Sequence, residues 1–106
     1  MASSQNFVNL YNMNNTYAVL GGGSWGTAIV KMLCENNNIV NWYIRSEEDV
    51  LFIKKKGRNS KYLQSVVFDK SKINPSSSLR EIVAKSDIII LAIPSPFLDT
   101  ELKKIS

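Results

Sequence analysis

The feature that most constrains this chain is a cluster of four glycines, Gly21, Gly22, Gly23 and Gly26. Glycine inside a regular helix or strand costs about 0.5–1 kcal/mol relative to alanine, so such a cluster needs a local reason. An apolar, β-prone run, YAVL at 17–20, leads into the glycines, and a helical apolar pattern follows them. The stretch therefore predicts a buried strand, a tight turn and a helix in immediate succession.

The helix after the turn carries apolar residues at helical spacing, namely Trp25, Ala28, Ile29, Met32 and Leu33. This spacing predicts one continuous buried stripe. Three consecutive asparagines at 36–38 are expected to end the helix, because asparagine tolerates the left-handed backbone found at helix ends.

Strands and helices are predicted to alternate along the rest of the chain. After the first helix we expect strands at 39–44, 65–68 and 87–94, and helices at 46–56, 78–86 and 96–105. The strand at 87–94 is apolar on both faces, as expected of a central strand in a parallel sheet. The alternation predicts an α/β fold with a doubly wound parallel sheet, formed by a domain at 16–106 after a poorly ordered leader at 1–15.

Composition excludes several other classes of protein. No apolar run approaches the eighteen or so residues of a membrane span, and without histidine a metal site is not expected. The single cysteine, Cys34, lies in an apolar helical pattern and is expected in the core, which suits a reducing cytoplasm. The net charge is +4, but the basic run KKKGR at 54–58 is interpreted as a helix C-terminus rather than a nucleic-acid patch.

Three of the glycines form the pattern G-x-G-x-x-G between the predicted strand and helix. In a dinucleotide-binding turn Gly21 permits the tight turn, Gly23 lets a pyrophosphate approach the backbone, and Gly26 lets the helix pack close to the strand. Backbone N–H groups at the helix start then bind the phosphates. Ser24 is a candidate for capping this helix, for donating to a phosphate, or for both, and the alternative is a glycine-rich turn without a ligand.

The end of the second strand is where a dinucleotide-binding fold contacts the adenosine ribose. Arg45 stands there, and arginine suits the 2′-phosphate of NADP, whereas NAD-specific sites place a carboxylate. We therefore predict that NADPH binds at least as well as NADH; the alternative for Arg45 is an exposed loop charge. Trp25 is predicted either as core or as a wall of the cofactor cleft.

From about Thr16 to Ser106 the chain resembles NAD(P)-dependent glycerol-3-phosphate dehydrogenase, bacterial type. The resemblance is carried by four segments in the same order, VLGGGSWGTA, NWYIR, NSKYL and DIIILAIPS. The resemblance implies a Rossmann-like fold and interconversion of dihydroxyacetone phosphate and sn-glycerol 3-phosphate for phospholipid synthesis. It also implies that Ser24, Trp25 and Arg45 contact the dinucleotide. Asn59, Tyr62 and Leu63 match a family segment for which loop packing is as good an explanation as ligand contact.

The resemblance also implies residues that this chain does not contain. Family members continue into a helical second domain that supplies catalytic lysine and phosphate-binding groups, so no catalytic residue is assigned here, and Lys103 and Lys104 are not given that role. The full-length enzyme is expected to be a cytoplasmic homodimer without nucleic-acid partners. Other dehydrogenases with this sheet and a helical second domain, such as ketopantoate reductase, are the alternative enzymes, although they match Ser-Trp-Gly-Thr-Ala poorly. A free-standing dinucleotide-binding module without catalysis is the second functional hypothesis.

Overall fold

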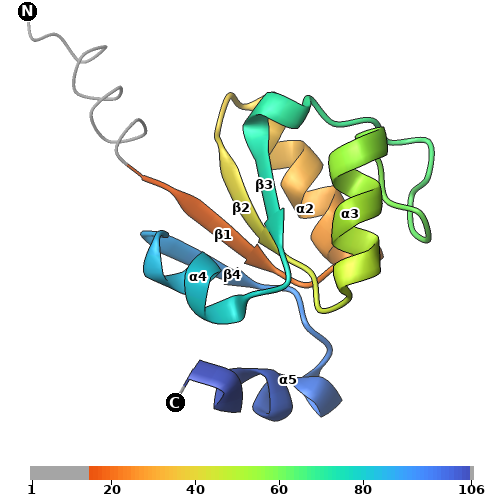
Figure 1. Ribbon diagram of the computed structural model, residues 1–106. Coiled ribbons are helices and arrows are strands. Elements are labelled where there is room, and N and C mark those ends of the chain that lie inside the picture. Colours follow the sequence, from red (N-terminus) through yellow and green to blue (C-terminus); the bar gives the residue numbers. More distant parts are fainter. Residues whose placement is uncertain (1–14, 106) are drawn as a thin grey trace, which may run out of the picture.

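A computed structural model describes residues 15–105 and shows a four-stranded parallel sheet in the order β3-β2-β1-β4 (Figure 1). The strands are β1 (Tyr17–Leu20), β2 (Val40–Tyr43), β3 (Ile73–Ser76) and β4 (Ile88–Leu91). The helices are α2 (Ser24–Glu35), α3 (Glu47–Lys56), α4 (Leu79–Ala84) and α5 (Ser95–Leu102), with 3-10 turns η1 (Lys70–Lys72) and η2 (Lys103–Ile105). The predicted doubly wound α/β fold is confirmed; the predicted leader lies almost wholly outside the described residues.

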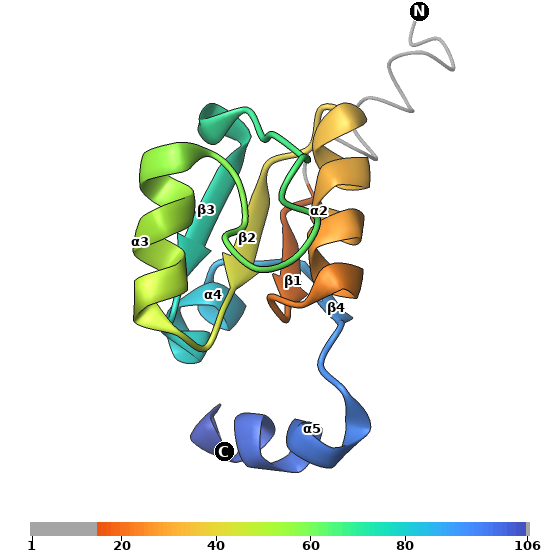
Figure 2. The same ribbon diagram turned by 90° about the vertical axis from the view of Figure 1, so that its right-hand side faces the viewer.

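The two faces of the sheet are covered by different helices (Figures 1 and 2). Helices α2 and α3 cover one face, and α4 covers the other. Successive strand residues point to opposite faces, so Val19 packs under α2 while Ala18 and Leu20 pack under α4. The strand order turns back on itself between β1 and β4, and ligands bind at this point in open α/β sheets.

Helix ends were predicted well from local sequence. Ser46 caps α3, since its Oγ accepts from the backbone N–H of Asp49 at 3.3 Å, and Gly57 ends the helix with φ 71°. The lysines of the basic run occupy the last turn of α3, which confirms the helix C-terminus. Asn37 adopts the expected left-handed backbone with φ 64° after α2.

The predicted stripe along the first helix is correct for Ile29 and Leu33, which pack against the core. It is wrong for Trp25, Ala28 and Met32, which are exposed. Trp25 is 74% exposed and Met32 is 55% exposed, whereas Thr27, Val30 and Cys34 are buried. The cause is Gly26: a Cβ built there would lie 2.1 Å from the carbonyl oxygen of Gly21. The glycine lets α2 touch the turn, and this contact sets which face of the helix meets the sheet.

The strand expected at 65–68 is also wrong, because this segment is a loop. It is held against the end of α3 by a 2.8 Å bond from the Phe68 N–H to the Gly57 carbonyl. The third strand instead spans Ile73–Ser76 and includes Pro75. Proline is tolerated there because β3 is at the edge of the sheet, where its missing N–H leaves no ladder bond unmade.

Strand β4 pairs with β1 on one side, and no strand among residues 15–105 pairs with its other side. Ile88, Ile89 and Leu91 are therefore 37%, 41% and 49% exposed. The apolar composition of β4 identified a strand correctly but did not determine its neighbours.

Candidate functional site

A cavity of about 640 Å³ opens at the carboxyl ends of the strands. Its lining comes from the glycine turn, the end of β2 with the start of α3, the loop after α3, and the segment from Ala92 into α5. In Figure 1 the turn and the β2 end lie at the same edge of the sheet, with α5 below them. This is the place where parallel α/β sheets bind ligands.

The glycines of the turn meet different surroundings. Gly21 has φ 133°, and a Cβ there would lie 2.4 Å from the Ala92 carbonyl oxygen, so the close approach of β4 requires glycine. Gly23 has φ −80°, which any residue adopts, and a Cβ there would meet nothing within 4 Å. Packing therefore gives no reason for glycine at this position, and the space that a side chain would fill opens onto the cavity that Gly23 lines.

The start of α2 presents backbone donors to the same cavity. The first hydrogen bond of the helix runs from the Thr27 N–H to the Gly23 carbonyl at 3.0 Å, so the N–H groups of Ser24, Trp25 and Gly26 precede the hydrogen-bonded ladder. Gly23 is the N-cap and no side chain caps the helix, so the capping role predicted for Ser24 is wrong. Ser24 is exposed at the cavity instead.

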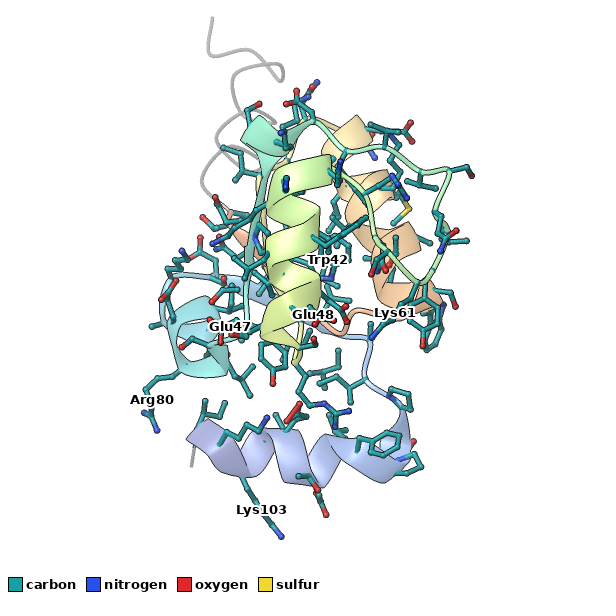
Figure 3. All side chains as sticks on the ribbon, turned by 45° about the vertical axis from the view of Figure 1, so that its right-hand side comes forward. Trp42, Glu47, Glu48, Lys61, Arg80 and Lys103 are labelled. Atoms are coloured by element: carbon teal, nitrogen blue, oxygen red, sulfur yellow. The ribbon has the colours of Figure 1, made fainter. Side chains whose placement is uncertain are left out.

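The carbonyl oxygens of the three consecutive glycines all accept hydrogen bonds from side chains: Gly21 from Trp42 Nε1 at 2.8 Å, Gly22 from Asn59 Nδ2 at 2.9 Å, and Gly23 from Thr27 Oγ1 at 2.7 Å. Trp42 lies in the interior beneath α3 (Figure 3). The turn is thus held from β2, from the loop after α3 and from α2 itself.

Charged side chains line the part of the cavity near the end of β2. Arg45 is exposed directly after the strand, and Lys61 comes from the loop after α3 (Figure 3). Asp49 also lines the cavity, with its carboxylate 3.2 Å from Lys61 Nζ. Asp49 was not among the predicted site residues, although it lies in the first turn of α3, a few residues after β2.

A buried carboxylate holds α5 to the sheet. Glu101 is 4% exposed and accepts a 2.9 Å bond from the Tyr43 hydroxyl, while Lys104 pairs with its other oxygen. Burial acts to raise the pKa of Glu101, but hydrogen bonds from Lys104 and Tyr43 outweigh it and hold the pKa below its usual range. Bonding to Glu101 and Tyr43 raises the pKa of Lys104. Lys104 therefore anchors α5, a role that sequence alone did not indicate.

The structure brings most of the predicted site residues together. Gly21, Gly23, Ser24, Trp25 and Arg45 line one cavity. Trp25 is exposed and lines this cavity, so its interpretation as core is wrong, and its role as a wall of a cofactor cleft stays a prediction.

The remaining predicted residues differ in burial and in whether they line the cavity. Gly26 lies beneath the turn, as the close helix contact predicted, and Asn59 is buried with 3% exposure. Tyr62 lines the cavity, whereas Leu63 is exposed outside its lining. Between residues 15 and 105 no group of three or more histidine, cysteine or acidic side chains is placed to hold a metal ion. No helix in that range has the length and hydropathy needed to cross a bilayer.

Comparison with known proteins relates this chain to one enzyme family. A family model described as NAD-dependent glycerol-3-phosphate dehydrogenase N-terminus matches residues 16–106. Glycerol-3-phosphate dehydrogenase (NAD(P)+) of Halothermothrix orenii is 34% identical over 94 residues, which cover 89% of this chain and 27% of that protein. The enzyme of the same description from Azotobacter vinelandii is 36% identical over 89 residues, or 84% and 26% of the two chains.

A solved structure supports the fold independently. The crystal structure of glycerol-3-phosphate dehydrogenase from Coxiella burnetii superposes with a TM-score of 0.74 at 24% identity, over 84% of this chain and 27% of that one. The chain thus spans about a quarter of the length of the relatives it matches. With its glycine turn, its four-stranded sheet and a match over residues 16–106, the chain belongs to the family of NAD-dependent glycerol-3-phosphate dehydrogenases, as the N-terminal, dinucleotide-binding part.

Proposed function

We propose that this chain binds NAD(P) in the cavity at the glycine turn. We further propose that the full-length protein interconverts dihydroxyacetone phosphate and sn-glycerol 3-phosphate, as the names of its relatives suggest, and so supplies phospholipid synthesis. The cofactor provides the hydride chemistry when bound. The residues of this chain bind and orient it.

The observation that carries the proposal is the open space over Gly23. A Cβ there would meet nothing within 4 Å, although the neighbouring glycines are tightly enclosed. The N–H groups at the start of α2 border the same space, and the helix dipole adds positive potential there. A pyrophosphate fits such a position because it accepts hydrogen bonds from several backbone donors at once.

The charges beyond the turn favour NADPH at least as much as NADH. Arg45 and Lys61 bring two positive charges to the end of β2, and Asp49 is ion-paired with Lys61. A 2′-phosphate gains charge-assisted hydrogen bonds from an arginine, whereas ribose hydroxyls gain less. NADH remains a ligand, since nothing in this arrangement excludes a hydroxyl.

Catalysis is proposed for the full-length protein and not for this part alone. None of residues 15–105 is assigned a catalytic role, and Lys104 is engaged by Glu101 and Tyr43. We expect the 106-residue chain to bind dinucleotide without oxidising NADPH in the presence of dihydroxyacetone phosphate. For the full-length enzyme we propose a homodimer in the cytoplasm, a reducing compartment that suits the free, buried Cys34.

The test is a calorimetric titration of the chain with NADPH and NADH, in wild type and in Gly23→Val. Valine adopts the extended backbone of this position, so the fold should survive, while its side chain fills the pyrophosphate space. Affinity for both cofactors is expected to fall by about a hundredfold or more, as for the loss of two or more charge-assisted bonds of about 1.5–3 kcal/mol each.

The matched control is Gly57→Ala, at the end of α3. It strains a left-handed residue with φ 71° and lowers stability without touching the cavity, so cofactor affinity should stay unchanged. Wild-type affinity in Gly23→Val with a native circular dichroism spectrum would show that the glycines only make a turn.

A further inference from the structure

Each peptide of the glycine turn has its carbonyl fixed toward the protein. In a planar trans peptide the N–H of the next residue points opposite to the carbonyl. A donor that holds the Gly22 carbonyl inward therefore turns the Gly23 N–H outward, toward the cavity. That donor is Asn59 Nδ2, at 2.9 Å.

Asn59 has all its hydrogen-bonding capacity engaged. Nδ2 donates to the Gly22 carbonyl and, at 3.1 Å, to Thr27 Oγ1, which itself donates to the Gly23 carbonyl. Oδ1 accepts from the backbone N–H groups of Lys61 at 2.8 Å and Tyr62 at 3.1 Å. Two acceptors on one side and two donors on the other determine which way the amide faces.

The site needs such a constraint because it is made of glycine. Glycine peptides change orientation at little cost, since both signs of φ are open to them. If the Gly22 peptide turned over, its carbonyl oxygen would face the bound phosphate and repel it. A buried side chain that donates to the carbonyl stabilises the orientation in which the N–H faces the anion.

We propose, on the basis of the function proposed above, that Asn59 is a positioning residue for dinucleotide binding. Its amide holds the Gly22 carbonyl, and through Thr27 the Gly23 carbonyl, away from the pyrophosphate. With its oxygen it fixes the Lys61–Tyr62 backbone, which forms the facing rim of the cavity. One side chain from the loop after α3 thus sets both walls of the site.

The test is Asn59→Asp, which keeps the shape and the acceptor oxygen but removes the N–H donors. Affinity for NADPH and for NADH should fall by the same factor, about tenfold at pH 8, because the shared pyrophosphate loses its oriented donors. Affinity should recover as the pH falls, since a protonated carboxyl regains one donor for the Gly22 carbonyl. A buried carboxylate also destabilises the fold until it is protonated, so a control with the same change at another buried asparagine is needed.

Asn41 provides the matched control. It is a second buried asparagine, 2% exposed, whose Nδ2 donates to Ser86 Oγ at 3.0 Å, near the opposite end of β2. Asn41→Asp should lower the unfolding temperature while the folded protein keeps wild-type affinity. If Asn59→Asp does not fold, Thr27→Val is the second variant. It removes the hydroxyl that donates to the Gly23 carbonyl and accepts from Asn59 Nδ2, and it should weaken both cofactors about threefold.

The outcomes separate the two proposals. Wild-type protein that binds neither NADPH nor NADH overturns the proposed function. If the wild type binds both cofactors and Asn59→Asp binds them with equal affinity, the positioning role alone is overturned. Where Asn59→Asp is unfolded, equal affinity in Thr27→Val overturns it. An equal loss in Asn41→Asp also overturns it, because the effect would then follow stability and not the turn.

Discussion

At the scale of single residues, the proposed cofactor choice rests on Arg45, the exposed cation in the cavity lining two residues past the end of β2. We expect Arg45→Asp to weaken NADPH by at least about tenfold, because charge-assisted hydrogen bonds to a phosphate contribute about 1.5–3 kcal/mol each. NADH should bind as before or better, since a carboxylate accepts from ribose hydroxyls. Titration of both cofactors at fixed salt measures the difference.

Arg80→Asp is the control for this charge reversal. Arg80 projects from α4 on the far side of the molecule from the glycine turn (Figure 3), so this variant changes the net charge equally without entering the cavity. Both cofactors should bind it as they bind the wild type. Equal losses for NADPH and NADH in Arg45→Asp would show that Arg45 does not distinguish the 2′-phosphate.

At the scale of elements, the attachment of α5 depends on one ionised group. The pKa of Glu101 is held below its usual value, with burial opposed by the bonds from Lys104 and Tyr43. A carboxylate with a lowered pKa stabilises the folded form fully above its unfolded pKa, and this contribution is lost as the pH falls through the folded value. We therefore expect α5 to loosen in acid, below about pH 4.5, the ordinary value for glutamate.

The measurement is amide hydrogen exchange of α5 across this pH range in wild type and Glu101→Gln. In the variant the loosening of α5 in acid should disappear. The free energy of unfolding at neutral pH should fall by about 1–2 kcal/mol, which is less than for a fully buried ion pair because Lys104 is partly exposed. Glu81→Gln removes an exposed pair with Lys85 on α4 and should change little. An unchanged acid step in Glu101→Gln would contradict the assignment.

At the scale of the whole molecule, the exposed edge at β4 is a place where another chain can pair with the sheet. Ile88, Ile89 and Leu91 stand on a strand whose second edge has no partner among residues 15–105. Such edges pair with other chains, so we expect this chain to self-associate. Ile89→Lys should shift sedimentation toward monomer. Leu51→Lys, on the exposed side of α3, adds the same charge elsewhere; an equal shift there would implicate net charge and not the edge.

The whole fold also shows what local sequence predicts and what it does not. The strands at YAVL and IVNWYI, the cap at Ser46 and the left-handed Gly57 follow from local preferences. The partners of Asn59 and Glu101 do not, because Asn59 contacts a carbonyl 37 residues away and Glu101 a hydroxyl 58 residues away. The glycines predicted the turn between β1 and α2, but the side chains that hydrogen-bond its carbonyl groups are brought there by tertiary packing.

The position of β1 in the sheet has a consequence for the synthesis of the protein. Its partner β2 follows after a single helix, whereas its other partner, β4, is made only after β2, α3, β3 and α4. In a chain growing from its N-terminus, the β2 side of β1 can therefore be covered while its β4 side stays bare, until residues 44–87 have been made. During that interval β1 has an unpaired edge whose N–H and C=O groups can bond to another chain. We expect β1 to be open to pairing with other chains until Ile88–Leu91 has emerged.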